Sequence, residues 1–439
     1  MNTSQKFAKY VTSSVLGMVG LSCYILADTY FVSAGVGGLG LAALNIAIPI
    51  FSLISGTGLM AGIGAASRFT ALRAAKDKNA ENIFTNICAF GMAAGVLITL
   101  LGFVFLEEIC LLLGADTETL AYTDEYLKTL MCTSLLFIMN NILTAFVRND
   151  GNPRLSMAAM LIGSFANILL DYLFIFPLGL GMFGAAAATA SAPIISMLIL
   201  SLHFLKKSNT FRLMKCRISP RAIASCLSMG IFSFVTELSS GIVMVFFNRS
   251  VFSLAGNTGV AAYGIIANVA LVAVSIFTGI SQGIQPLVSV SAAEKNKPEL
   301  SKILRLACVL SLAVAGILFA AAYFFREPTV ALFNKENDAE MTALACRGLV
   351  LYFTGFFAAG LNIIAAAFCA ACTKTKESFL ISMMRGVIFI LPAILILSHT
   401  AGTDGIWLSF GTAEALTLVF SAVTTVRYFR KFAKSAKSS

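Results

Sequence analysis

Apolar runs of about 20 residues recur along the whole chain, and they restrict its fold more than any other feature. A helix needs about 20 apolar residues to cross the hydrocarbon core of a bilayer. In that medium every backbone polar group must bond within the protein, which leaves helices or closed barrels. Alternation of polar and apolar residues with period two is absent, which argues against a barrel. With 58% hydrophobic and 12% charged residues, we expect an all-α polytopic membrane protein.

The runs and the breaks between them predict twelve membrane-spanning helices. Stretches rich in Gly, Pro and Asn, such as 148–154 and 177–181, mark the breaks. No cleavage pattern follows a short apolar core near the N-terminus, so we expect no removable signal peptide. The predicted spans are about 11–33, 42–65, 84–106, 126–147, 155–177, 182–204, 224–247, 259–283, 304–325, 346–369, 379–398 and 405–426.

Positive charge is divided unevenly between the two sets of loops that alternating spans create. With the N-terminus inside, the inner segments hold 25 Lys and Arg residues and the outer segments hold 5. This bias follows the positive-inside rule, so we expect a cell-membrane protein with both termini in the cytoplasm. It also explains the net charge of +10. Because the charge is spread over many loops, no nucleic-acid partner is expected.

An internal repeat divides the predicted spans into two sets of six. Leu41-Ala42-Ala43 has a counterpart in Val260-Ala261-Ala262, Phe146 has one in Phe368, and Gly181 has one in Gly402, all with nearly the same spacing along the chain. Both sets start inside, so we expect two parallel six-helix lobes related by a pseudo-two-fold axis along the membrane normal. The predicted parts are an N-lobe at 1–205, a cytoplasmic linker at 206–223, and a C-lobe with a basic tail at 224–439.

Four acids fall inside predicted spans, where a carboxylate costs about 2.5–3.5 kcal/mol at the bilayer centre. They are Asp28, Asp171, Glu237 and Glu414. Asp28 lies about 8 Å below the outer end of span one at about 1.5 Å per residue, and Asp171 lies at a similar depth in span five. Asn167 is one turn from Asp171 on the same face.

Thr189 of span six lies at a similar depth, so Asp28, Asn167, Asp171 and Thr189 are predicted to form one polar layer. Two carboxylates in a layer of low dielectric do not both ionise easily, which suits uptake and release of a proton. Carboxylate, amide and hydroxyl oxygens also suit Na⁺, a hard cation. The choice between H⁺ and Na⁺ stays open.

The remaining polar signals are weaker. Glu237 and Glu414 are predicted to line a cavity of the C-lobe, or to form interhelical hydrogen bonds as protonated acids. Gln282 and Gln285 are predicted as gate, cavity or helix-packing residues. His203 and His399 lie far apart in the sequence, so no metal site beyond possible Na⁺ is expected. No nucleotide-binding loop follows a strand, and no cofactor is expected.

Several stretches together resemble the multidrug and toxic compound extrusion (MATE) family, in its bacterial and archaeal branch with short loops. The resemblance covers nearly the whole chain. The stretches that carry it include ADTYFVSAGVGGLGLAAL (27–44), FVRNDGNPR (146–154), NILLDYLFIF (167–176), GMFGAAAATA (181–190) and VTEL (235–238).

The resemblance implies roles for particular residues. Asp28 matches the acid of span one, Asn167 and Asp171 match an Asn-x-x-x-Asp pair of span five, and Thr189 completes the cluster that binds H⁺ or Na⁺. Some members add a C-lobe pair, of which Glu237 matches the first acid. The partner acid of span ten is missing from 353–371, so a complete C-lobe cation site is not expected.

The function expected from these observations is secondary antiport. A duplicated six-span architecture is typical of transporters that work by alternating access. The resemblance implies export of amphipathic, often cationic organic compounds in exchange for H⁺ or Na⁺. We expect a monomer in the lipid bilayer that is not an enzyme. One alternative is a flippase for a lipid-linked saccharide, which would need a strongly cationic cavity. A membrane receptor or enzyme is the other, and it would need a soluble domain or a cofactor constellation.

Overall fold

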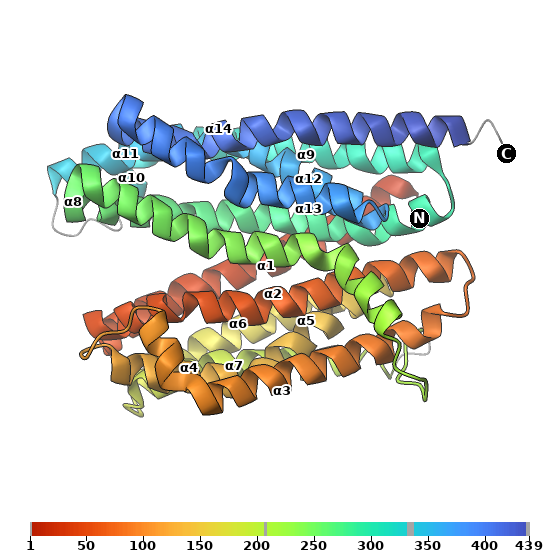
Figure 1. Ribbon diagram of the computed structural model, residues 1–439, viewed down its shortest axis with the longest axis horizontal. Coiled ribbons are helices and arrows are strands. Elements are labelled where there is room, and N and C mark those ends of the chain that lie inside the picture. The colour runs from red at the N-terminus through yellow and green to blue at the C-terminus, as the bar shows by residue number, and fades with distance from the viewer. Residues whose placement is uncertain (1, 206–208, 332–337, 436–439) are drawn as a thin grey trace. The chain divides into compact units, whose positions relative to one another are not determined.

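The computed structural model describes residues 2–205, 209–331 and 338–435, and every regular element in these ranges is helical (Figure 1). Nine of the described helices are long and apolar enough to cross a membrane, and two bent pairs bring the number to eleven. One of the nine, Thr375–Arg430, is broken at Gly402 and contains the last two predicted spans. The prediction of an all-α, multi-pass membrane protein is therefore confirmed.

Residues Met1–Leu238 form one compact unit, called unit 1 here. Within it α1 packs on α6, α6 packs on α7, and α2 packs on α5. Unit 1 contains α1 (Thr3–Gly35), α2 (Gly38–Ala74), α3 (Ala80–Leu112), α4 (Leu120–Cys132), α5 (Ser134–Asn149), α6 (Pro153–Ile175), α7 (Gly181–Ser201) and the first part of α8 (Pro220–Ala293).

Residues Ser239–Ser439 form the second compact unit, unit 2. Here α12 packs on α14, α9 and α13. Unit 2 contains the rest of α8, which is broken at Gly256, and then α9 (Lys297–Phe324), α10 (Arg326–Ala331), α11 (Ala339–Phe353), α12 (Phe356–Ala371), α13 (Thr375–Met383), the π-helix η1 (Met384–Ile388) and α14 (Ile390–Ser435).

Local chemistry, and not hydropathy, sets the ends of the helices. The first span is predicted from residue 11, yet α1 begins at Thr3 because Asn2 and Gln5 form a reciprocal capping box there. The fourth predicted span is two helices, α4 and α5, that meet at Thr133 with a bend of 48°. The tenth is likewise α11 and α12, bent by 45°. The predicted spans are therefore right in place and wrong at several ends.

The internal repeat is visible in the backbone. The hydroxyl of Ser156 donates to the carbonyl oxygen of Thr144 at 3.2 Å, and the hydroxyl of the equivalent Ser378 donates to that of Ala366 at 2.7 Å. Left-handed backbone conformations also recur at equivalent positions of the repeat. The pairs with positive φ are Gly37 and Gly256, Lys76 and Lys295, Gly151 and Thr373, and Gly181 and Gly402. Turns with the same geometry therefore connect equivalent spans.

The segment 209–219, before α8, has no regular structure and is bound to the rest of unit 1 through Asp150. The Asp150 carboxylate accepts hydrogen bonds from Arg73 Nη1 at 2.8 Å and from the backbone N–H of Thr210 at 3.0 Å. It also accepts from the Thr210 hydroxyl and pairs with His203 Nε2 at 2.9 Å. We call these four residues the Asp150 clamp. Residues 206–208 of the predicted linker lie outside the described residues.

Two further contacts hold the same segment. The backbone N–H of Ser219 donates to Asn86 Oδ1 at 2.6 Å, at the point where α8 is about to begin. The ring of Phe211 is buried among Phe84 and Phe146, with ring centroids 4.8 and 5.3 Å away. The predicted linker is therefore part of the packed surface of unit 1 over its described length, and its last residues, from Pro220, already belong to α8.

Candidate functional site

The structure brings the four residues of the predicted polar layer together inside unit 1. Asp28 lies on α1, Asn167 and Asp171 lie one turn apart on α6, and Thr189 lies on α7. All four are buried, with Asn167 and Asp171 fully inaccessible. Since α6 packs on both α1 and α7, the three helices carry the side chains into one interior region. We call these four residues the N-cluster.

The amide of Asn167 connects two members of the N-cluster. In the orientation that its neighbours require, the amide nitrogen donates to Asp171 Oδ2 at 3.1 Å, and the amide oxygen accepts from the backbone N–H of Thr189 at 3.2 Å. Asp28 and Asp171 interact electrostatically with each other. The amide therefore fixes one oxygen of Asp171 and orients the other.

Two carboxylate oxygens of the N-cluster, Asp28 Oδ1 and Asp171 Oδ1, are buried and have no hydrogen-bond partner among the described residues. The Thr189 hydroxyl lies beside the hydroxyl of Tyr126. Buried polar atoms are nearly always paired, so each unpaired oxygen needs an explanation. A proton shared between the two carboxylates, or Na⁺ held by carboxylate and hydroxyl oxygens, would satisfy them. The residues present thus fit either ion.

Two tyrosines belong to the same region and were missed in the sequence. Tyr24 is buried within electrostatic range of Asp28, Asp171 and Glu237. Tyr126 of α4 is buried beside Thr189. Tyr24 lies one turn before Asp28 on the same helix face, a spacing that could have revealed it. Tyr126 gave no such signal, because only the packing of α4 on α7 brings it there.

Unit 2 has no equivalent of the N-cluster at the positions that the repeat predicts. Those positions hold Phe247, Phe389, Ala393 and Phe410. Phe410 stacks on Tyr352 with ring centroids 4.4 Å apart, and Phe247 contacts Tyr352 at 5.9 Å. Aromatic packing thus fills the place that polar groups occupy in unit 1. This agrees with the missing acid of the tenth predicted span.

Glu237 lies near the end of unit 1, in the first part of α8. Its Cβ would lie 3.4 Å from a Cβ placed on Gly56 of α2, and its carboxylate is within electrostatic range of Tyr24. The glycine thus leaves room for the acid between α2 and α8. Of the two predicted C-lobe acids, this one therefore packs within unit 1, and only Glu414 belongs to unit 2.

Glu414 is ion-paired, and its environment differs from that of Glu237. Arg385 Nη2 donates to Glu414 Oε1 at 2.7 Å, and Arg385 Nε donates to the same oxygen at 3.1 Å. The sequence predicts Glu414 as an acid that lines a cavity or as a protonated acid in interhelical hydrogen bonds, and it does not predict the pairing with Arg385. Gln282 and Gln285 are buried in the second part of α8. Both polar side-chain atoms of Gln285 lack a partner among the described residues.

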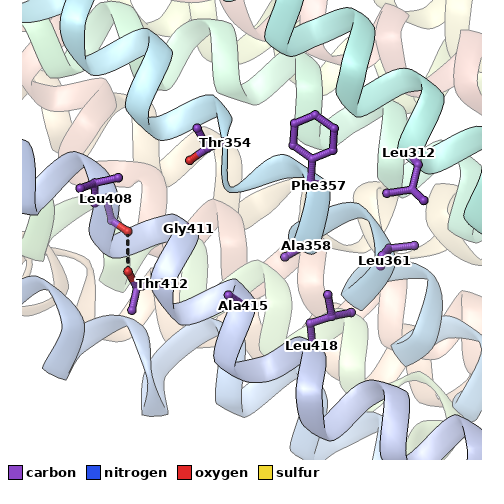
Figure 2. A pocket seen from close by; sticks show the side chains of 10 residues that line it. All are labelled: Leu312, Thr354, Phe357, Ala358, Leu361, Leu408, Gly411, Thr412, Ala415 and Leu418. Atoms are coloured by element: carbon purple, nitrogen blue, oxygen red, sulfur yellow. Dashed lines mark hydrogen bonds between the residues drawn. The ribbon is translucent and has the colours of Figure 1, made fainter.

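A pocket of about 410 Å³ lies in unit 2 between α9, α12 and α14 (Figure 2). Its walls are mostly apolar, with Phe357, Leu361 and Leu418 among them, and Thr354 and Thr412 contribute hydroxyls. The Thr412 hydroxyl donates to the carbonyl oxygen of Leu408 in its own helix. None of the predicted site residues lines this pocket. Its chemistry resembles that of the surrounding hydrocarbon more than that of a charged site.

Comparison with known proteins identifies the family. The MatE family model matches residues 14–173 and 230–395, which is most of the chain and includes the equivalent parts of both repeats. The chain belongs to the MatE family. The first matched range of this MatE protein contains Asp28, Asn167 and Asp171, and the second contains Glu237 and Arg385.

Curated relatives and solved structures agree with this family. The MatE protein is 26% identical over 400 residues to the multidrug export protein MepA of Staphylococcus saprophyticus, covering 90% of this chain and 87% of that protein. It is likewise 26% identical over 397 residues to MepA of Staphylococcus aureus, with the same coverage.

Among solved structures, it superposes with a TM-score of 0.93 and 22% identity on an outward-facing multidrug resistance MATE family transporter of the MOP superfamily, covering 99% and 97% of the two chains. A MOP superfamily transporter from Pyrococcus furiosus matches with a TM-score of 0.91 and 21% identity, again covering 99% and 97%. The fold is therefore that of these transporters.

Proposed function

We propose that this MatE protein is a secondary antiporter that exports amphipathic, often cationic organic compounds in exchange for H⁺ or Na⁺. The observation that carries the proposal is the N-cluster, with an unpaired carboxylate oxygen on each of Asp28 and Asp171, buried in unit 1. Buried carboxylates within membrane helices are expensive, and they typically mark ion pathways. The names of the MepA relatives support export of varied compounds.

In the proposed mechanism the ion changes the charge of the N-cluster. Without an ion, Asp28 and Asp171 repel each other in a region of low dielectric. Binding of H⁺ or Na⁺ removes the repulsion and lets α1 settle against α6. A ligand shifts a conformational equilibrium only by its differential affinity for the two states, so ion and substrate must favour different states. Alternating access then couples inward ion flow to outward export.

A flippase for a lipid-linked saccharide is less well supported. That function would need a strongly cationic cavity for a pyrophosphate. Arg385, which lies well inside the helices of unit 2, is neutralised by Glu414. The geometry therefore favours the export of organic compounds.

The test is gradient-driven efflux from liposomes that contain the purified protein and a fluorescent cation. A H⁺ gradient and a Na⁺ gradient are imposed in turn, and efflux driven by one of them is expected. Asp28→Asn and Asp171→Asn should each reduce this efflux to near background, and the double variant should be little worse, because the two acids form one device. Asp77→Asn, at an exposed aspartate of the same unit, is the control. Efflux at the wild-type rate in the double variant would refute the mechanism.

The two predicted lobes should contribute unequally. We expect Glu237→Gln to weaken efflux less than Asp171→Asn, because the tenth predicted span, 353–371, contains no acid that could pair with Glu237. The measurement is the initial efflux rate of both variants under the same gradient. If Glu237→Gln abolishes efflux while Asp171→Asn leaves it unchanged, the ion site has been placed on the wrong residue.

A further inference from the structure

Unit 2 has a buried charged network of its own, which the proposed ion site does not use. Arg385 of η1 forms two hydrogen bonds to Glu414 of α14. Asn362 Nδ2 of α12 donates to Glu414 Oε2 at 2.8 Å, and the Ser421 hydroxyl donates to Asn362 Oδ1 at 2.8 Å. Asn362, Glu414 and Ser421 are buried, and the Arg385 side chain is 11% exposed. Glu414 is therefore the buried centre of the network, and the Arg385 side chain is its most exposed member.

The network lies well inside the membrane-spanning helices. At about 1.5 Å per residue, Arg385 is about 15 Å from the start of α13, and Asn362 is about 14 Å from the end of α12 at the same turn. A hydrocarbon core of about 30 Å places both near its middle. An arginine at this depth is costly unless it is paired, and such residues typically serve function.

The fold itself does not require these charges. Aligning Phe146 with Phe368 makes Gly163 of unit 1 the equivalent of Arg385, and aligning Gly181 with Gly402 makes Pro193 the equivalent of Glu414. Gly163 packs close to α7, with a carbonyl oxygen 3.1 Å from where its Cβ would be. The same helix contacts are thus made in unit 1 without charge. The ion pair is a property of unit 2 and not of the architecture.

The Arg385 guanidinium uses only part of its hydrogen-bonding capacity among the residues that the structure describes. Nε and Nη2 both donate to Glu414, whereas no hydrogen bond is made by Nη1 to any residue that the structure describes. Glu414 therefore fixes the planar group and neutralises it, and leaves N–H donors of Nη1 free. A guanidinium in this arrangement binds a carboxylate through short, charge-assisted hydrogen bonds. Arg385 lies in the π-helix η1, and π-helical turns are frequent at functional sites, which supports a functional role for this residue.

We propose that Arg385 is a substrate-recognition residue of unit 2, and that it binds a carboxylate on the transported compound while Glu414 positions it. The proposal rests on the proposed export function and narrows the substrate class to amphipathic compounds that carry a carboxylate, zwitterions included. A singly charged carboxylate fits the pair better than a phosphate dianion, because it adds only one negative charge to a neutral pair at low dielectric.

The test uses two dyes that differ only at the proposed contact: a xanthylium dye with a free carboxylate and the methyl ester of the same dye. Binding of each to the purified protein in detergent is measured by fluorescence anisotropy. Arg385→Gln should weaken binding of the carboxylate dye by about 10- to 100-fold, as for loss of a hydrogen bond to a charged group. The affinity for the ester should change less than about threefold, well below the change expected for loss of a hydrogen bond to a charged group.

Three controls keep the outcome decisive. Arg347→Gln breaks an exposed ion pair with Asp404 in the same unit and should alter neither dye. The double variant Arg385→Gln, Glu414→Gln removes the pair without leaving a buried charge, so it should fold and reproduce the selective loss. Arg385→Lys keeps the charge and should recover part of the carboxylate-dye affinity. Equal loss for both dyes in the double variant, or no loss for either, would overturn the proposal.

Liposome efflux of the same dyes separates this proposal from the proposed function. Selective binding at Arg385 without gradient-driven efflux would leave the recognition site standing and remove the antiport. Gradient-driven efflux of both dyes at rates that Arg385→Gln does not change would support the antiport and refute the recognition site at Arg385.

Discussion

Asp150→Asn should release the segment 209–219 from the rest of unit 1, because the Asp150 clamp depends on the buried carboxylate of Asp150. The Asp150 side chain is 1% exposed, whereas Arg73 is 51% exposed. The pair with Arg73 is therefore screened and contributes at most about 1 kcal/mol. The larger part comes from the donors of Thr210 and from His203, which is fully buried.

The expected loss follows from these bonds. A hydrogen bond to a charged group contributes about 1.5–3 kcal/mol, and asparagine keeps one acceptor oxygen. We therefore expect local opening to become easier by about 2–4 kcal/mol, which is roughly a 30- to 900-fold increase in the open population at about 1.36 kcal/mol per factor of ten.

Limited trypsin digestion of the purified protein measures this opening. Arg212, Lys215 and Arg217 lie in the segment, and cleavage tracks the open population when opening and closing are fast. The initial rate of cleavage within the segment 209–219 should rise in Asp150→Asn and stay unchanged in Asp77→Asn, whose aspartate accepts a hydrogen bond from the backbone N–H of Asn79 in its own turn. An equal cleavage rate in Asp150→Asn and the wild type would show that the clamp does not hold the segment.

Other outcomes are expected from single features of the structure. A Cβ on Gly64 would clash with the backbone carbonyl oxygen of Cys226 in α8, so Gly64→Ala should cost about 1–3 kcal/mol and lower the Tm. Gly264→Ala meets nothing within 4 Å and should gain up to about 1 kcal/mol. Hydrogen bonds from the Thr119 backbone N–H and hydroxyl lower the pKa of Asp116 below its ordinary 3.8. The loop stability that they supply is present above that ordinary value and is lost as the pH falls through the lowered pKa, so hydrogen exchange at the Thr119 amide should accelerate there, but not in Asp116→Asn. A cysteine probe at Asn209 should label only from the cytoplasm, and one at Asp116 only from outside; reversed labelling would overturn the predicted orientation.

Much of the fold could be predicted because the hydrocarbon core of a bilayer admits only helices or closed barrels. The apolar runs located the spans, and the repeated motifs, such as those at Gly181 and Gly402, located turns whose backbone geometry does recur. The N-cluster could be predicted for the same reason. Asp28 and Asp171 are too costly to be incidental, and depth alone places them in one layer.

Contacts between distant segments could not be predicted in the same way. Arg385 and Glu414 lie on separate helices, and helical spacing does not state which faces of α13, η1 and α14 meet. His203 was compared only with His399 as a metal ligand, whereas the structure pairs it with Asp150. Helix ends were missed where a cap such as Asn2, or a bend such as Thr133, decides them.

The Asp150 clamp also has a consequence for biosynthesis. Asp150 and its donor Thr210 are 60 residues apart, and chains are made at about 5–20 residues per second. The carboxylate therefore waits roughly 3–12 s after its own synthesis before its last donors exist, a time set by the same rate. During that interval α6 and α7 are synthesised, but the Asp150 carboxylate lacks the hydrogen bonds that Thr210 will donate to it. Unit 1 therefore cannot form all the bonds around Asp150 until the segment that follows α7 has been synthesised.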